Sequence, residues 1–368
     1  MTGQVFIDSS YRYPGVEVTW AGECPLTGGL CFGTESGGIL VPLPDATGEA
    51  AWLVNDLGDV VNAVAFGDSY CVASTPSRVA IVDLFSGEVL QVLSSGAHDV
   101  VSLDGDRFLL SAGIGGMRIV SVRNRQVYVT EHSDQDRPTY FYLATRLTNR
   151  PNEILVAIAA RQSGMLSATI SRSSDNVTIA AHLFPESDIV SVVGIPRDEF
   201  ACGAVGLDAD ANLLVTRDIL KERPTQIRFS EMPGRAYTIR FVGPHLALLT
   251  SKAIHLIHDF SSQISRIVAG SCTGTRTAVA PVQASEIYVA FDRYLLVELD
   301  NEISALDVKT VFDFEEKPLL TFASDSFSPA SGRKLWSPTP GKAEHSIKTI
   351  PIAPPPSFSN VELTATCS

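Results

Sequence analysis

The sequence predicts an all-β fold made from one repeated unit. Paired apolar runs joined by short turns recur along the chain, and each pair has a short apolar run before it and a weaker one after it. The spacing between repeats is about 40 to 50 residues. Four short strands per repeat, separated by turn residues, are typical of a propeller blade. We therefore predict a seven-bladed β-propeller of four-stranded antiparallel blades, followed by an irregular Pro/Ser-rich C-terminal tail.

Each predicted blade has recognisable strands in order. Val, Ile, Thr and aromatic residues dominate these runs and breaks fall every six to ten residues, so strands are favoured and no long helix is predicted. The first strands are VEVTW, VVNAVAF, VVSLDG, TYFYLAT, IVSVVGI, YTIRFVG and TAVAPV. The second-to-third-strand hairpins are LCFGTESGGILVPL, YCVASTPSRVAIVDL, FLLSAGIGGMRIVSV, ILVAIAARQSGMLSATI, FACGAVGLDADANLLVT, LALLTSKAIHLIHDF and IYVAFDRYLLVEL. Fourth strands are clearest in EVLQVL, QVYVTE, NVTIAAH and TQIRFS.

The two ends of the chain receive separate predictions. The segment GQVFIDS, residues 3–9, alternates in polarity, and we expect it to complete the last blade beside residues 303–314. The propeller is thus predicted to span residues 1–320 and the C-terminal extension residues 321–368. The extension is rich in Ser and Pro, and it could be draped on the propeller, dock on another chain or be disordered.

Composition restricts the classes of partner. The formal net charge of −13, with 19% charged residues, argues against nucleic-acid binding, which needs clustered cations. The first residues lack the pattern of a signal peptide, and no apolar run approaches 18 residues, so we expect no membrane contact and a cytoplasmic location. Six scattered cysteines form no C-x-x-C pair, which predicts reduced thiols.

Two repeats have residues in common with a known family. Residues 60–98 resemble a WD-repeat blade, with Val82-Asp83 where that family favours Trp-Asp. The next repeat has Ala97-His98 in place of Gly-His, and its His98 and Ser111 match two positions of the family's hydrogen-bond network. The chain is thus similar to a degenerate WD-repeat propeller. The resemblance implies a rigid platform for protein partners, with enzymes and small-molecule binders as minority roles.

No pattern in the sequence predicts catalysis, a cofactor or a metal site. The stretch DADAN, residues 208–212, begins like a calcium loop, but Leu213 replaces the required glycine and Ile219 the required Glu. His255 and His258 are three apart in a predicted strand, so they should project to opposite faces. We found no nucleophile, zinc or phosphate-binding motif, and we expect a protein that is not an enzyme.

One face of the predicted propeller is rich in arginine. Loops that join second to third strands should share a face with loops that join consecutive blades, and Arg outnumbers Lys by 21 to 7 in the chain. Arginine and aromatic residues are frequent at the energetic centres of interfaces. Acids lie in the same loops, so ordinary solvated charge is the simpler alternative. The candidate partner-binding residues are Arg78, Arg161 and Arg293 in the first kind of loop, Arg137, Arg235 and Arg276 in the second, Tyr140 and Tyr142 nearby, and Trp336 in the tail.

The leading hypothesis is a non-catalytic scaffold or recognition subunit of a multiprotein assembly. It would bind another protein chain through the propeller loops or the C-terminal tail. The alternative is a sensor that binds a small ligand in the central channel. An enzyme is disfavoured because the predicted first strands offer almost no carboxylates or histidines to that channel.

Overall fold

The computed structural model describes most of the predicted propeller. The residues that it describes are 17–25, 29–42, 50–54, 56–133, 139–196, 202–221, 224–229, 234–269, 276–281, 283–290, 292–299, 302–308 and 311, with the short strands 334–335, 345–346, 359–362 and 365–367.

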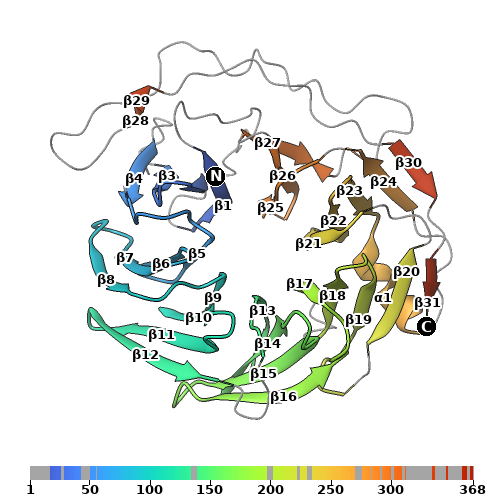
Figure 1. Ribbon diagram of the computed structural model, residues 1–368, viewed down its shortest axis with the longest axis horizontal. Coiled ribbons are helices and arrows are strands. Elements are labelled where there is room, and N and C mark those ends of the chain that lie inside the picture. The colour runs from blue at the N-terminus through green and yellow to red at the C-terminus, as the bar shows by residue number, and fades with distance from the viewer. Residues whose placement is uncertain are drawn as a thin grey trace.

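These residues form antiparallel sheets arranged in a ring (Figure 1). Chain order runs outward within each sheet, so the first strand of each is innermost. The first blade consists of β1(Val18–Cys24), β2(Gly29–Thr34), β3(Ile39–Pro42) and β4(Ala50–Val54). The second consists of β5(Ala63–Phe66), β6(Tyr70–Ser74), β7(Val79–Asp83) and β8(Val89–Leu93). The third consists of β9(Asp99–Asp104), β10(Arg107–Ser111), β11(Met117–Arg123) and β12(Gln126–His132).

Three further sheets of four or more strands continue the ring. They are β13(Leu143–Asn149), β14(Glu153–Ala159), β15(Met165–Ser171) and β16(Val177–Leu183); β17(Ile189–Gly194), β18(Ala204–Asp208), β19(Leu213–Thr216) and β20(Thr225–Phe229); and β21(Ala236–Val242), β22(His245–Thr250), β23(Ile254–Ile257) and β24(Arg276–Ala280). The all-β propeller of four-stranded antiparallel blades is therefore confirmed.

The described residues form six complete blades, not the predicted seven. The last hairpin lies in a three-stranded sheet of β25(Ile287–Ala290), β26(Tyr294–Leu299) and β27(Glu302–Asp307). Its inner strand β25 contacts β21 on one side and β1 on the other, so this sheet stands between the sixth blade and the first (Figure 1). The strand predicted at residues 3–9, as the partner of residues 303–314, lies outside the described residues.

The predicted strand assignment of the last repeat is wrong by one strand. The run TAVAPV, expected to begin a blade, supplies β24, which pairs with β23 as the outer strand of the sixth blade. The hairpin IYVAFDRYLLVEL therefore provides first and second strands rather than second and third. The reason is the helix α1(Phe260–Val268), which occupies the connection between β23 and β24 and delays the fourth strand.

The end of the chain adds strands to two blades. β30(Ser359–Glu362) pairs antiparallel with β24, and β31(Ala365–Cys367) pairs antiparallel with β20. The outer edges of the fifth and sixth blades are thereby covered by the chain itself, which leaves fewer unpaired strand edges. A separate two-stranded ribbon joins β28(Lys334–Leu335) to β29(His345–Ser346).

The hydrophobic core lies between the sheets. Each apolar cluster takes side chains from two neighbouring blades, as in the cluster that joins Val72 and Ile81 of the second blade to Phe108 and Val120 of the third. Equivalent clusters join the first blade to the second, the third to the fourth, the fourth to the fifth, the fifth to the sixth, and the sixth to the three-stranded sheet. One blade alone would leave both of these faces exposed to water.

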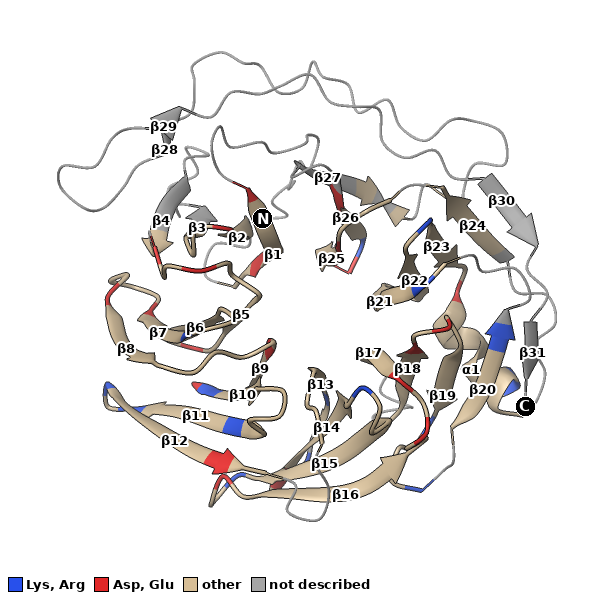
Figure 2. Ribbon diagram, in the orientation of Figure 1, with Lys and Arg blue, Asp and Glu red and all other residues tan. Residues whose placement is uncertain are grey.

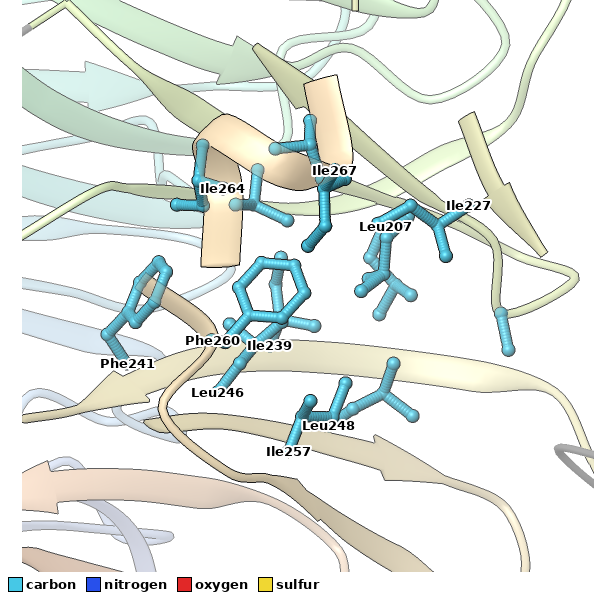
Figure 3. Packing of buried hydrophobic residues seen from close by; sticks show 14 of the residues in the cluster. Leu207, Ile227, Ile239, Phe241, Leu246, Leu248, Ile257, Phe260, Ile264 and Ile267 are labelled. Atoms are coloured by element: carbon cyan, nitrogen blue, oxygen red, sulfur yellow. The ribbon is translucent and has the colours of Figure 1, made fainter. Parts of the chain in front are cut away.

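The helix α1 covers the cluster between the fifth and sixth blades (Figure 3). Phe260, Ile264 and Ile267 recur at the spacing of one helix face and are all buried. They pack with Leu207 of β18 and Leu246 of β22, among others. This helix was not predicted, because Phe260 follows the apolar run of β23 closely and continues the pattern of a strand.

Strand direction defines two faces of the ring. We call the linker face the one that has the second-to-third-strand loops, such as 75–78 and 160–164, and the loops between blades, such as 94–98 and 184–188. The opposite face has the turns between first and second strands and between third and fourth strands, together with α1.

Removing an apolar contact of α1 tests its packing. Ile264→Ala should lower the free energy of unfolding by about 2 to 4 kcal/mol, because it leaves a cavity between two blades. Urea unfolding measures the change. Ser265→Ala, at an exposed position of the same helix, is the control and should change stability by less than about 0.5 kcal/mol. Equal effects of the two substitutions would show that α1 is not packed as described.

Candidate functional site

A cavity of about 580 Å³ opens at the centre of the ring. It is lined by inner strands, by the loops that lead into them and by Glu298 of the second strand β26, on the linker side of the channel. A drug-sized ligand occupies a pocket of comparable size. Its lining residues are Thr19, Trp20, Ala21, Gly22, Val60, Val61, Asn62, Ala63, His98, Asp99, Tyr142, Leu143, Tyr237, Arg240, Glu286, Tyr288, Val289 and Glu298.

Three carboxyl groups line this cavity: Asp99, Glu286 and Glu298. Figure 2 shows acidic segments on the inner side of the ring, at β9 and beside β25. They come from the third blade and from the three-stranded sheet, which lie far apart in sequence. Of the three, only Asp99 lies in an inner strand, at the start of β9, whereas Glu286 precedes β25 and Glu298 lies in the second strand β26. The prediction considered the inner strands alone and so did not cover the two glutamates.

Asp99 begins β9 and is held by backbone N–H groups. Val100 N–H donates to its Oδ1 at 2.9 Å, and Ala144 N–H of the next blade donates to its Oδ2 at 2.9 Å. Burial raises the pKa of Asp99 to about 6, although both of these hydrogen bonds and the positive charge of Arg240 oppose the rise. Asp99 thus fixes the start of β13 against β9 and also presents an acid to the cavity.

Glu286 precedes β25 and is the carboxylate nearest to a cation. Its Oε1 accepts a hydrogen bond from Ile287 N–H at 3.0 Å and lies 4.0 Å from Nη2 of Arg240. Burial raises the pKa of Glu286, and Arg240 and the Ile287 N–H oppose that rise. The Arg240 guanidinium is also engaged elsewhere, because its Nη1 donates to Thr238 Oγ1 at 2.8 Å and to the Ile239 carbonyl at 2.9 Å.

Glu298, in β26, is buried, with 8% of its surface exposed. Burial raises its pKa to about 7; the charge of Glu286 adds to the rise, and the Tyr288 phenol opposes it. Within the described residues Glu298 forms no ion pair with Lys or Arg. A buried carboxylate without a cation is costly, so it either takes up a proton or attracts a positive ligand.

Tyr288 connects this acid to the first blade. Its hydroxyl donates to the Thr19 carbonyl of β1 at 2.7 Å, which bridges the three-stranded sheet and β1. Burial raises the pKa of Tyr288, and Glu286 and Glu298 add to the rise, so the phenol keeps its proton. The phenol has one hydrogen: donated to Glu298 it stabilises the carboxylate, whereas donated to the Thr19 carbonyl it leaves Glu298 able to bond to the phenol only as a protonated donor.

An aromatic cluster lies beside the cavity on the linker face. The Tyr140 hydroxyl is 2.5 Å from Nε2 of His98, and the His98 ring centroid lies 5.3 Å from that of Tyr140 and 5.5 Å from that of Tyr142. The Arg161 guanidinium carbon lies 5.4 Å from the Tyr142 ring centroid, and Arg161 Nε is 3.3 Å from Asp188 Oδ1. These residues, except His98, line a second cavity of about 510 Å³, and Tyr142 belongs to both cavities.

This cluster replaces the hydrogen-bond network expected from the WD-repeat resemblance. The His98 ring forms a hydrogen bond with Tyr140, which lies in the loop between the third and fourth blades. Burial lowers the pKa of His98, which favours the neutral ring. The hydroxyl of Ser111 is buried and has no hydrogen-bond partner among the described residues. The WD-repeat assignment is therefore not confirmed.

The structure brings three predicted partner-binding residues together: Tyr140, Tyr142 and Arg161. Arg78 and Arg235 share the linker face but lie elsewhere on it. Arg78 Nη1 donates to the Leu57 carbonyl at 3.3 Å, and Arg235 is exposed in the loop before β21.

Two other predicted residues lie away from the linker face. Arg293 is in the turn between β25 and β26, on the opposite face, and Arg276 begins the outer strand β24 at that same side. Both errors follow from the one-strand shift in the last repeat. Arg137 and Trp336 lie outside the described residues.

Four charged residues of the central cavity were not predicted as site residues: Asp99, Arg240, Glu286 and Glu298. A usable signal is present, since GAHDVV and ASEIYV each place an acid directly before an apolar inner strand. Arg240 and Glu298 sit inside strands whose neighbours are buried, and that pattern alone does not show that they face the channel.

Other candidate positions have ordinary structural surroundings. Asp208 accepts hydrogen bonds from the backbone N–H groups of Asp210 at 3.0 Å and Asn212 at 2.8 Å, as an acid does in a tight turn. His255 is buried in β23, and burial lowers its pKa to about 4. Across the described residues no three His, Cys, Asp or Glu side chains are placed to hold a metal ion. In that same part of the chain no helix has the length and apolarity needed to span a membrane.

Comparisons with known proteins address the fold. No protein-family model matches the chain, and no curated protein matches it by sequence. The chain is similar to the solved Cps50 (Swd1) β-propeller domain of Myceliophteria thermophila, with a TM-score of 0.59 and 11% identity, over 82% of this chain and 99% of that one. It is also similar to the computationally designed Ika8 protein, with a TM-score of 0.55 and 12% identity over the same shares. At such low identity, these similarities support the propeller fold alone.

The surroundings of Glu298 predict a pH-dependent stability. Its pKa in the folded chain, about 7, is above its ordinary value of 4.5. Its favourable contribution is therefore fully present below about pH 4.5 and is lost as the pH rises through about 7. Glu298→Gln removes this pH-dependent loss. Between about pH 4.5 and pH 7, the difference in free energy of unfolding between the variant and the unsubstituted chain should therefore shift by about 2 to 3 kcal/mol in favour of the variant.

Urea unfolding at a series of pH values provides the measurement. Glu186→Gln is the control, because Glu186 is exposed in the turn between β16 and β17. Its curve should run parallel to that of the unsubstituted chain. A parallel curve for Glu298→Gln as well would contradict the buried, unpaired state of this carboxyl group.

Proposed function

We propose that this chain is a non-catalytic recognition subunit that binds a protein partner through the linker face. The observation that carries the proposal is the cluster of His98, Tyr140, Tyr142 and Arg161 at the rim of the central cavity. Tyrosine and arginine give large contact areas with polar tips and are frequent at the energetic centres of interfaces. The similarity to a propeller domain supports a platform role, although fold alone does not determine function.

The contrast between the two faces supports the choice of surface. On the opposite face, Arg107 pairs with Asp104 at 2.9 Å and with Asp175 at 2.5 Å, and Arg172 also pairs with Asp104. The Arg107–Asp175 and Arg172–Asp104 pairs join the third blade to the fourth, so these charges serve the packing of the ring. The aromatic cluster of the linker face borders open cavities instead.

A second candidate function is binding of a small ligand in the central cavity. The observation in its favour is that Glu298 faces a cavity of about 580 Å³ and has no basic partner among the described residues. As part of this proposal we place the chain in the cytoplasm.

We also propose that the three-stranded sheet is an incomplete seventh blade. Its inner strand takes the place in the ring that a blade between β21 and β1 would have, and it buries apolar side chains against the sixth blade. If residues 3–9 supply its fourth strand, a chain without residues 1–10 should unfold at a lower urea concentration than the full chain. An unchanged midpoint would count against this completion.

The recognition proposal predicts that partner capture depends on one aromatic–arginine pair. Tagged full-length protein is used to capture partners from its native cells, and the captured proteins are identified by mass spectrometry. Tyr142→Ala with Arg161→Gln should remove at least one specific partner, because it truncates the cluster and its cation–π contact.

A matched pair on another surface provides the control. The Arg123 guanidinium carbon lies 6.0 Å from the Tyr128 ring centroid, and Tyr128 is exposed on the outer strand β12. Tyr128→Ala with Arg123→Gln should leave capture unchanged. Loss of the partner in the control alone would place the contact on the outer rim, and unchanged capture by both variants would overturn the linker-face proposal.

A further inference from the structure

The charges that face the central cavity do not balance. Of the residues that the structure describes, three carboxyl groups, those of Asp99, Glu286 and Glu298, line it together with one guanidinium, that of Arg240. Arg240 Nη2 lies 4.0 Å from Glu286 Oε1, and Arg240 Nη1 donates two hydrogen bonds to groups of its own strand, β21. With all groups ionised the lining therefore has an excess of two negative charges.

Glu298 is the side chain that points most directly to a ligand. It is more than nine-tenths buried, it lines the cavity, and the charges that act on it are those of other acids, Glu286 and Glu17. Its surroundings within the described residues thus favour either a bound proton or a bound cation. The cavity beside it has room for a group much larger than a proton.

The walls of the cavity suit an organic cation. Trp20, Tyr142 and Tyr288 contribute aromatic rings to the lining, and aromatic rings attract ammonium and guanidinium groups. The acids are spread over separate elements, and no three of the described acidic, His or Cys side chains are close enough to hold a metal ion. An organic cation with an alkyl chain can contact the aromatic rings and, through its charged group, also interact with carboxylates that lie on separate elements.

We propose that the central cavity binds an alkylguanidinium or alkylammonium group through Glu286 and Glu298. The group is either that of a free small molecule or that of a basic side chain inserted by a bound protein. This inference names the ligand class for the second candidate function above. Its test substitutes Glu286 and Glu298 and leaves intact the Tyr142–Arg161 pair that tests partner recognition, although Tyr142 also lines this cavity.

Titration calorimetry of the full-length chain with n-butylguanidinium chloride tests the proposal, with n-butylurea as the neutral compound of the same shape. The cation should bind saturably and at least about tenfold more tightly than the urea, because a charge-assisted bond to carboxylate is lost in the latter. Equal binding of the two compounds, or no saturable binding of the cation, would overturn the proposal.

Substitutions locate the binding site. Glu286→Gln combined with Glu298→Gln should weaken binding of n-butylguanidinium by at least about tenfold, while Glu186→Gln should leave it unchanged. Unweakened binding to a folded double variant would overturn the proposal. Should the double variant fail to fold, the comparison of cation with urea still decides the question on the unsubstituted chain.

The pH dependence provides an independent readout. The titratable groups that line the cavity are Asp99 of β9, Glu286 and Tyr288 at β25, Glu298 of β26, Arg240 of β21, Tyr237 of β21, His98 before β9 and Tyr142 before β13. Between about pH 5 and 8 the acids lose protons, so n-butylguanidinium should bind more tightly at the higher pH. Tighter binding at the lower pH would contradict a carboxylate site.

A peptide separates the two sources of the cation. If the acetylated and amidated tripeptide Gly-Arg-Gly binds more tightly than n-butylguanidinium, a protein side chain is the ligand, because the peptide backbone adds contacts at the rim. If the peptide binds more weakly, the ligand is a free small cation. Either result supports a cation site, provided that n-butylurea binds more weakly than both.

Discussion

Covering both faces of every sheet is the constraint on which this structure depends. Each apolar cluster joins two neighbouring sheets, so no blade has a core of its own. When the sheets stack around an axis, each blade buries its two faces against its two neighbours. Where the connection between β23 and β24 departs from a plain turn, the helix α1 supplies Phe260 and Ile264 to the same kind of cluster. The packing between blades therefore accounts both for the regular sheets and for this exception.

The same arrangement makes the axis different from the rest of the interior. Inner strands begin close together there, yet the cavity of about 580 Å³ between them is not filled by apolar side chains. Backbone N–H groups hold Asp99 in place, and the phenol of Tyr288 ties the three-stranded sheet to β1. Rigid strands thus hold carboxyl groups at the cavity although burial disfavours their ionised form. Buried ionisable groups of this kind are common at binding sites.

The sequence predicts the repeated four-strand unit well because alternating apolar runs and turn residues are local signals. The first six repeats follow this pattern, and Tyr140, Tyr142 and Arg161 were correctly placed on one face. The helix α1 displaced the pattern by one strand, which moved Arg276 and Arg293 to the other side. The acidic cavity was missed because Asp99 and Glu298 meet only when blades far apart in sequence close the ring, and no local pattern contains that information.

Ring closure leaves the carboxyl group of Glu298 buried beside a cavity, and no described Lys or Arg neutralises it. Carboxyl ¹³C NMR of the full-length chain, titrated with and without Glu298→Gln, tests this claim most directly. We expect the resonance that is lost in the variant to titrate with a midpoint near pH 7, because burial raises the pKa of this group to about 7. A midpoint near the ordinary value of 4.5 would show an exposed or neutralised carboxylate and would contradict the account.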